Sequence, residues 1–357
     1  MKSIRTLLLG ARAAFFRYSG LLWWVKRQMR QRGDVIVLMF HRVLDRPAAD
    51  QACSLGEIVV SQGHFRKLCQ YLARHCEVVS AGEAQPGRSS SKLRVMITFD
   101  DGWKDNFTTA LPVLRSHDLP ATIFVCPALA GQTFPFWPER MVSLLRRQPQ
   151  HSPRTVESTI ESWKHRPQKE RDRYMQQLEK TAHRAVASAE ATDQLLSWSE
   201  TEALHREGIA FGSHTQHHEI LPLVARDTAW RELRESKESV ESMLDVRCDT
   251  LAYPNGDYST QVRDIAETLG YRLAFTTERA AWTSETDPLL IPRCNMYDGN
   301  LEGLWGSFSR SAFEYTTFWK AWRATPRHVV KSAQAISRPA PQLAETPTER
   351  EREHASR

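Results

Sequence analysis

Short runs of apolar residues alternate along this chain with stretches of helical periodicity, and this alternation constrains the fold more than any other feature. The first run, residues 35–40, reads Val-Ile-Val-Leu-Met-Phe, which is typical of a buried strand. Strand, helix and strand at this spacing predict βαβ units and a parallel sheet. About seven candidate strands favour a closed or nearly closed α/β barrel over an open sheet; they lie at residues 35–40, 94–99, 121–126, 209–212, 250–253, 272–276 and 289–291.

Three regions lie outside this alternation. Residues 137–195 are rich in Gln, Arg and Glu and have helical but no strand periodicity, so we expect a helical insertion over one face of the sheet. From Pro326 onward, Pro, Ala, Glu and Arg dominate, which predicts a disordered tail. We therefore expect a basic amphipathic segment at 1–33, a barrel with its insertion at 34–310, and a helical extension with a flexible tail at 311–357.

The positive charge of the chain is concentrated in its first 33 residues. They hold eight Lys and Arg and no acid, whereas the net charge of the whole chain is +6. The body is therefore slightly acidic, which argues against nucleic acid as a partner. Leu, Phe and Trp are interspersed with these cations, so we expect an amphipathic helix at an anionic membrane surface. The alternative is a helix packed on the body with its cations in water.

The same segment bears on where the protein works. Arg12 interrupts the apolar run too early for a secretory signal peptide, and no apolar run reaches the ~18 residues of a membrane-spanning helix. Six scattered cysteines without a C-x-x-C pair indicate reduced thiols. We expect a cytoplasmic protein, or one bound peripherally to the cytoplasmic face of a membrane.

Polar side chains follow four of the expected strands, at the edge of a parallel sheet where active sites form. They are His41, the pair Asp100 and Asp101, the segment 213–218 and the segment 253–257. Two adjacent carboxylates beside a core need a cation or hydrogen-bond donors. The alternative for Asp100 and Asp101 is a solvated Asp-Asp-Gly turn.

His214 and His218 lie four residues apart, which places both imidazoles on one face of a helical or turn-like segment. In a chain with 13 histidines this spacing is common by chance, so its weight comes from following a buried strand. With Asp101 they form a two-histidine, one-carboxylate set that suits a first-row metal with open positions. Such a metal lowers the pKa of bound water towards about 7, and Asp100 would take the proton of that water. His217 is interpreted as a bystander.

These motifs resemble those of the polysaccharide deacetylase family, also described as the NodB homology domain or carbohydrate esterase family 4. The resemblance rests on Thr98-Phe-Asp-Asp-Gly102 and His214-Thr-x-x-His218 and extends over residues 35–300, with Tyr253-Pro-Asn-Gly256 typical of one branch. It implies a distorted (β/α)7 TIM-like barrel. It also implies metal-dependent hydrolysis of N-acetyl, sometimes O-acetyl, groups on sugars.

The resemblance further implies a role for each matching residue. Asp100 is the expected catalytic base. One divalent metal is expected, zinc by default, with cobalt, nickel or iron also fitting the ligands Asp101, His214 and His218. Tyr253 and Asn255 belong to the expected oxyanion and substrate segment, in which the backbone N–H of Asn255 stabilises charge on the acetyl oxygen. A plain Pro-Asn-Gly turn is the alternative for that segment.

Two departures from the family pattern concern the proton transfers. The position of the Arg that pairs with the base is Ala252, and the Leu-x-His motif that supplies a general acid is absent, because the stretch reads Ile291-Pro-Arg293. We expect His41 to protonate the leaving amine and Arg293 to replace the missing Arg. The competing interpretations are a strand-end histidine with satisfied hydrogen bonds and a surface arginine.

The sequence thus predicts a metal-dependent deacetylase that acts on an N-acetylated saccharide, such as a glycan or glycolipid intermediate. Two alternatives stay open. One is hydrolysis of a small non-sugar amide by the same chemistry, and the other is a non-catalytic glycan-binding protein that keeps the barrel. The two departures favour a binding protein, whereas the paired aspartates argue against it, because a binding protein does not need them.

Overall fold

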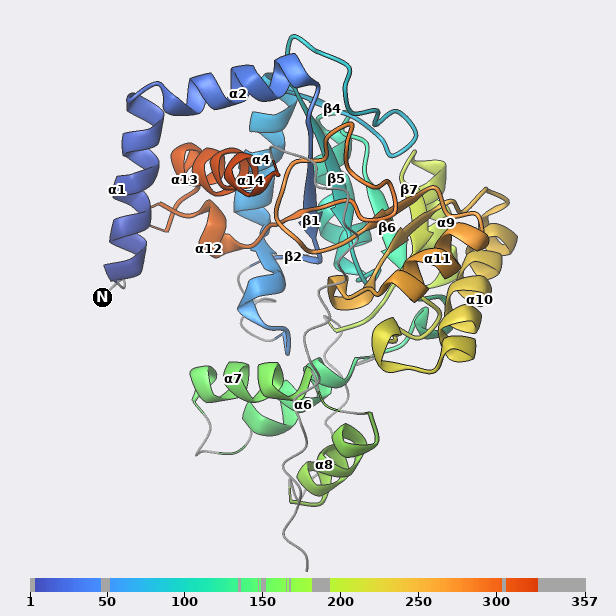
Figure 1. The fold of residues 1–357 in the computed structure, drawn as a ribbon. Coiled ribbons are helices and arrows are strands. Elements are labelled where there is room, and N and C mark those ends of the chain that lie inside the picture. Colours follow the sequence, from blue (N-terminus) through green and yellow to red (C-terminus); the bar gives the residue numbers. More distant parts are fainter. Residues whose placement is uncertain are drawn as a thin grey trace, which may run out of the picture.

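The structure is a computed structural model that describes residues 4–326 apart from gaps at 46–51, 134–135, 147, 149–151, 165, 167, 182–192 and 304–305, so the expected tail beyond Pro326 lies outside the described residues. A parallel sheet curls into a distorted (β/α)7 barrel, as the sequence predicts (Figure 1). Around the sheet the strands are β10 (Cys294–Asn295), β1 (Val35–Phe40), β5 (Leu93–Phe99), β6 (Thr122–Val125), β7 (Ala210–Ser213), β8 (Thr250–Ala252) and β9 (Leu273–Phe275). A further strand, β4 (Cys76–Val78), pairs with the start of β5.

Residues 291–295 lie between the two edges of this sheet. Ile291 forms a parallel bridge with Phe275 of β9, and Cys294 and Asn295 pair with β1. The last strand expected at 289–291 is therefore reduced to a single bridge, and β10 forms just after it. Pro292 accounts for the break, because it has no N–H to donate to a neighbouring strand.

Helices pack on the outside of the sheet, each through an apolar face. They are α4 (Gln62–His75), α5 (Leu111–Arg115), α9 (Trp198–Arg206), α10 (Arg226–Leu244) and α11 (Thr260–Thr268). The chain before α5 forms a π-helical turn at Asn106–Ala110, and a small parallel pair, β2 (Arg42–Leu44) and β3 (Val59–Ser61), follows β1. All residues of β1 and β5 are buried, which gives the site above them a rigid base.

The insertion consists of three helices, α6 (Trp137–Arg146), α7 (Pro153–Lys164) and α8 (Gln168–Thr181). They lie beyond the carboxyl ends of the strands, at the mouth of the barrel, and not over one face of the sheet as expected (Figure 1). The reason is topological, because the insertion interrupts the connection from β6 to α9, and such connections leave the carboxyl ends of parallel strands. A bridge between Thr133 and Gln194 brings its two ends together.

The N-terminal segment forms α1 (Ile4–Tyr18) and α2 (Leu21–Arg32), which meet at Gly20 with a left-handed φ of 79°. The C-terminal elements are α12 (Asp298–Leu301), α13 (Arg310–Glu314), a π-helical segment (Tyr315–Trp319) and α14 (Lys320–Ala324). Helix α1 packs on α13 and on the π-helical segment, and α2 packs on the same segment and, through Trp24 against Trp322, on α14. The buried Glu314 carboxylate accepts hydrogen bonds from Lys26 at 2.8 Å and Arg17 at 3.3 Å. This packing corresponds to the alternative weighed above for residues 1–33.

The outer faces of α1 and α2 nevertheless remain apolar. The exposed side chains there are Leu8, Phe15, Tyr18, Leu21, Trp23 and Trp24. Arg12, Arg27 and Arg32 are exposed beside them. No helix within the described part of the chain is long and apolar enough to cross a membrane.

Candidate active site at the mouth of the barrel

The two aspartates that follow β5 leave the strand through a tight turn. Asp101 and Gly102 both have left-handed backbones, with φ of 72° and 75°. A Cβ at Gly102 would lie 2.9 Å from Cγ1 of Val125, so the turn requires glycine there. The turn separates the two carboxylates, because Asp100 and Asp101 meet different partners.

Asp101 meets the two imidazoles that follow β7. Its Oδ1 lies 3.4 Å from Nε2 of His214 and 3.4 Å from Nε2 of His218. Nδ1 of His214 lies 2.7 Å from the carbonyl oxygen of Ala252, so Nδ1 holds the ring proton and Nε2 offers its lone pair. Burial opposes ionisation of Asp101, but both imidazoles lower its pKa well below the usual value.

These three ligand atoms all lie within 4.8 Å of one another. Two nitrogens and one carboxylate oxygen are the donors that zinc and related first-row metals take in catalytic sites. The expected residues therefore fit a divalent metal. A second cluster of this kind, His64 with Asp298 and Glu302, lies elsewhere, and there both ring nitrogens of His64 already have hydrogen-bond partners.

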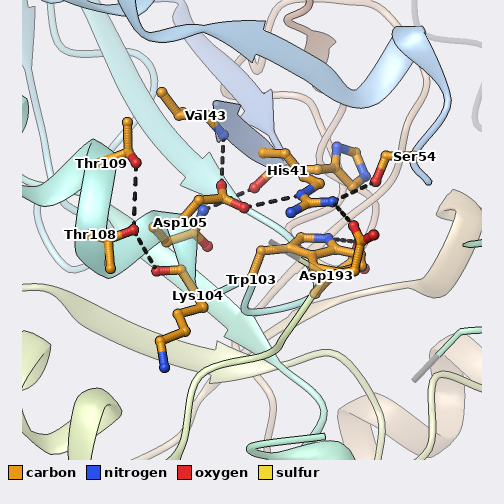
Figure 2. Close-up of polar contacts among 12 residues, drawn as sticks. His41, Val43, Ser54, Trp103, Lys104, Asp105, Thr108, Thr109 and Asp193 are labelled. Atoms are coloured by element: carbon orange, nitrogen blue, oxygen red, sulfur yellow. Dashed lines mark hydrogen bonds and ion pairs between the residues drawn. The ribbon is translucent and has the colours of Figure 1, made fainter. Parts of the chain in front are cut away.

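A hydrogen-bond network lies behind Asp101, and Figure 2 shows four of its members, Trp103, Asp105, Asp193 and Ser54. Nε1 of Trp103 donates to Oδ2 of Asp101 at 2.9 Å, which leaves Oδ1 for the imidazole side. The buried guanidinium of Arg42 lies 4.2 Å from the centroid of the Trp103 ring. It donates to three residues: Asp105, Asp193 and Ser54. Because Asp193 lies at the end of the insertion, the network connects the insertion to the candidate metal ligands.

Asp100 is bound by the arginine that the sequence predicts. Two nitrogens of Arg293 donate to its two carboxylate oxygens, at 2.6 and 2.7 Å, and Nε of Arg293 donates to the carbonyl oxygen of Thr276. Arg293 is fully buried, so it is not a surface cation. Burial opposes ionisation of Asp100, but Arg293 and His214 lower its pKa, so the carboxylate is ionised.

His41 lies in the wall of the same cavity as Asp100 and Asp101. Its Nδ1 is buried without a hydrogen-bond partner, so the interpretation as a satisfied strand-end histidine does not hold for that atom. Burial lowers the pKa of His41 against the pull of the two aspartates. The ring is therefore neutral before the reaction and carries one proton rather than two.

The segment 253–257 meets its expectations only in part. The Tyr253 hydroxyl donates to the carbonyl oxygen of Leu289 at 3.1 Å, and its backbone N–H donates to Phe275. Tyr253 is fully buried and offers no group to a substrate, which corrects its expected place in the substrate set. Asn255 has a left-handed φ of 58° and lines the cavity, while its side chain donates to Asp257.

A cavity of about 310 Å³ joins these residues to the insertion. Asp100, Asp101, His41, His214, His218 and Asn255 line its barrel side. His217 also lines it and pairs with Glu232 at 2.8 Å, which agrees with a bystander role. The chain that enters the insertion and the insertion itself contribute Phe136, Trp137, Glu139, Arg140, Arg171 and Asp172 to the lining of the same cavity.

The sequence did not indicate that residues of the insertion line the cavity, nor that Trp103 donates a hydrogen bond to Asp101. The insertion shows only helical periodicity, and nothing in that pattern indicates which of its turns faces the barrel. Trp103 follows directly on the Asp-Asp-Gly turn, so its proximity to Asp101 was visible in the sequence, whereas the direction of its N–H was not.

Comparison with known proteins identifies relatives of this chain by sequence and by fold. A sequence model described as polysaccharide deacetylase matches residues 87–274, which is more than half of the chain. A curated protein of Bacillus subtilis (strain 168), named "Putative polysaccharide deacetylase YxkH", is 23% identical over 224 residues. That match covers 63% of this chain and spans 59% of the length of the relative.

Two solved structures share the fold. The Streptococcus pyogenes deacetylase PplD, in complex with acetate, is 18% identical and superposes with a TM-score of 0.52 over 77% of this chain and 98% of its own. The de-N-acetylase from Aggregatibacter actinomycetemcomitans is 13% identical, with a TM-score of 0.50 over 79% of this chain and 99% of its own. At these identities the likeness concerns the arrangement of strands and helices.

Proposed function

The chain belongs to the polysaccharide deacetylase family, and from that premise we propose that it is a metal-dependent hydrolase that removes N-acetyl groups from a saccharide. The observation that carries the proposal is the separation of two adjacent carboxylates. Asp101 faces two imidazoles, whereas Asp100 faces a buried guanidinium. One carboxylate is thereby placed to bind a cation and the other to accept a proton, which is the division that hydrolysis by an activated water requires.

Asp101, His214 and His218 would hold the metal, with zinc as the first candidate. When bound, it would supply Lewis-acid polarisation of the acetyl oxygen and a lowered pKa for water. Asp100 accepts the proton of the attacking water, and Arg293 keeps Asp100 ionised and fixed in orientation. The backbone N–H of Asn255 is our candidate for an additional donor to the acetyl oxygen.

The leaving nitrogen needs a proton, and the cavity wall offers two candidate donors. His41, the donor expected from the sequence, remains one of them, and its unpartnered Nδ1 supports a role in proton transfer. Its neutral state requires that it first receive a second proton within the catalytic cycle. Glu139 is the other candidate, and its case is argued in the next subsection.

We also propose that the outer faces of α1 and α2 contact an anionic membrane surface. Exposed aromatic side chains beside arginines support this proposal, since such faces partition into the headgroup region. A membrane contact would suit a glycolipid substrate.

The function is tested by acetate release from N-acetylated chitooligosaccharides with zinc, cobalt, nickel or iron added. We expect wild-type protein to release acetate and Asp100→Asn to lose the activity while its metal content is unchanged. His214→Ala should lose metal and activity together. Asp118→Asn and His117→Ala serve as matched controls outside the cavity wall.

Each alternative predicts a different result in this assay. A hydrolase of small amides would release acetate from simple N-acetyl amines in preference to the saccharides. A binding protein would bind the saccharide and release no acetate with any of the metals. Wild-type activity in Asp100→Asn would contradict the proposed mechanism outright.

A further inference from the structure

Removal of an N-acetyl group, the function proposed above on which this inference rests, requires a proton donor. Without one, the nitrogen would depart as an anion far too basic to be released in water. Asp100 cannot be this donor at the outset, because it is ionised and accepts the proton of the water. After it takes that proton, Asp100 stays bound through both oxygens to Arg293, so we consider as the donor a second group in the cavity wall that carries a proton before the reaction begins.

Glu139 lies in the cavity wall contributed by the insertion. It occupies the first turn of α6, and only 4% of the residue is exposed. It lines the same cavity as Asp100 and Asp101. Among the charges with the largest effect on it, Asp101 and Asp193 oppose its ionisation, whereas the guanidinium of Arg42 favours it. That guanidinium is itself bound by Asp105 and Asp193.

The start of α6 is held in place by packing on both sides. Below it, buried side chains of the three insertion helices form one apolar cluster, which consists of Met141, Val142, Leu144, Leu145, Val156, Ile160, Met175 and Leu178. Beside it, the guanidinium of Arg171 lies 5.1 Å from the centroid of the Trp137 ring. Glu139 therefore belongs to a packed part of the wall of the cavity that the paired aspartates also line.

We propose that Glu139 is the general acid that protonates the leaving nitrogen. Water loses a proton to Asp100 and adds to the acetyl carbon. When this tetrahedral adduct collapses, the electron pair of the C–N bond passes to nitrogen, and nitrogen takes the proton of the Glu139 carboxyl group. The products are the free amine and acetic acid. Loss of the proton from Asp100 to solvent and uptake of one by Glu139 restore the starting state.

The surroundings of Glu139 favour its protonated form. Burial is the larger cause, and together with the Asp101 carboxylate it raises the pKa of Glu139 to about 8. A metal bound by Asp101 would offset the effect of that carboxylate, so in the loaded enzyme the proton on Glu139 depends on burial. For His41, by contrast, burial lowers the pKa and so disfavours the protonated, cationic form that could donate a proton. Active sites commonly assign the roles of acid and base to two carboxyl groups in this way: one has a raised pKa and stays neutral, and the other has a lowered pKa and stays ionised.

The experiment compares two acetyl substrates that differ in their need for this proton. An N-acetylated chitooligosaccharide must have its nitrogen protonated, whereas 4-nitrophenyl acetate releases a stable phenolate. Both rates are measured with the metal-loaded enzyme, and the rate retained by Asp100→Asn is subtracted. The variants are Glu139→Gln, His41→Gln and Glu139→Asp, with Glu157→Gln on an exposed position of α7 as the matched control. Metal content and thermal unfolding are recorded for each.

We expect Glu139→Gln to lower acetate release from the saccharide by about 100-fold or more, the usual size of a general-acid effect. The ester rate should fall much less, so that the ester-to-amide ratio rises by at least about tenfold. Glu139→Asp, which keeps an acid, should recover part of the amide rate. A merely structural role for Glu139 would lower both rates by the same factor.

Equal loss of both rates, or no loss, in Glu139→Gln would overturn the proposal. A selective loss of the amide rate in His41→Gln alone would overturn it in favour of His41. In both cases the wild-type enzyme still releases acetate from the saccharide, so the proposed function survives. If wild-type enzyme hydrolyses only the ester, the proposed function fails, and the assignment of Glu139 fails with it.

Discussion

Arg293 binds both carboxylate oxygens of Asp100 across 193 positions of the chain, and both side chains are buried. Arg293 lies in the segment that follows β9 in sequence and leads directly into β10, the strand that pairs with β1. The candidate base is thus positioned by the part of the chain that completes the barrel.

Arg293→Met should destabilise the protein by about 3–5 kcal/mol, because it leaves the Asp100 charge buried without its partner. Unfolding in urea measures this loss. The double variant Asp100→Asn with Arg293→Met should be more stable than Arg293→Met alone, since neither charge then remains. Strictly additive losses would show that the two side chains are not coupled in the folded protein.

Trp103→Phe should weaken metal binding by about 10–100-fold, because the hydrogen bond to Oδ2 of Asp101 is lost while the ring remains. Competition with a chelator of known affinity measures the effect. Trp230→Phe on α10 is the matched control, and its metal affinity should equal that of the wild type. An unchanged affinity in Trp103→Phe would mean that the indole N–H does not orient the ligand.

The double variant Phe15→Ser with Trp23→Ser should bind vesicles that contain phosphatidylglycerol at least about tenfold more weakly than wild type, because each change removes exposed apolar area. Co-sedimentation at two salt concentrations measures binding, which should weaken as salt rises. Leu223→Ser, at an exposed apolar residue outside α1 and α2, is the control. If the control variant lost vesicle binding to the same extent, α1 and α2 would not be the surface that contacts the membrane.

His64→Gln should reduce stability at pH 6 more than at pH 8.5. A hydrogen bond to Asp298, at 2.8 Å, raises the pKa of His64, so its stabilising effect is complete below the ordinary pKa of histidine and fades as pH rises through the raised value. Burial opposes ionisation of Asp298, but His64 lowers its pKa, so that contribution fades at low pH instead. Denaturant unfolding at both pH values measures the difference. A loss that is larger at pH 8.5 would contradict this sign.

Local patterns were sufficient to predict much of this arrangement. The strands before Asp100 and His214 are continuous apolar runs, and parallel topology brings their carboxyl ends together whatever the loops do. Arg293 could be proposed because Ala252 stands where the family pattern has the arginine that pairs with the base, although only the pairing of β10 with β1 explains how Arg293 reaches Asp100.

Contacts that depend on tertiary packing could not be predicted in this way. The position of Glu139 depends on how the insertion helices pack, which helical periodicity does not reveal. Tyr253 was misassigned because a motif gives residue order but not side-chain direction, and its hydroxyl turns into the core. The segment 1–33 was expected as one helix, but it bends at Gly20 and packs through Glu314.

The bridge between Thr133 and Gln194 means that the insertion departs from the barrel and rejoins it at nearly one point. An insertion attached in this way can vary in length and sequence while the strand that leads to the paired aspartates keeps its register. Its Arg42–Asp193 link is the connection that any replacement would have to restore. Because Glu139, the proposed proton donor, lies on α6 within this insertion, a replacement would also have to bring an acid of its own to the cavity.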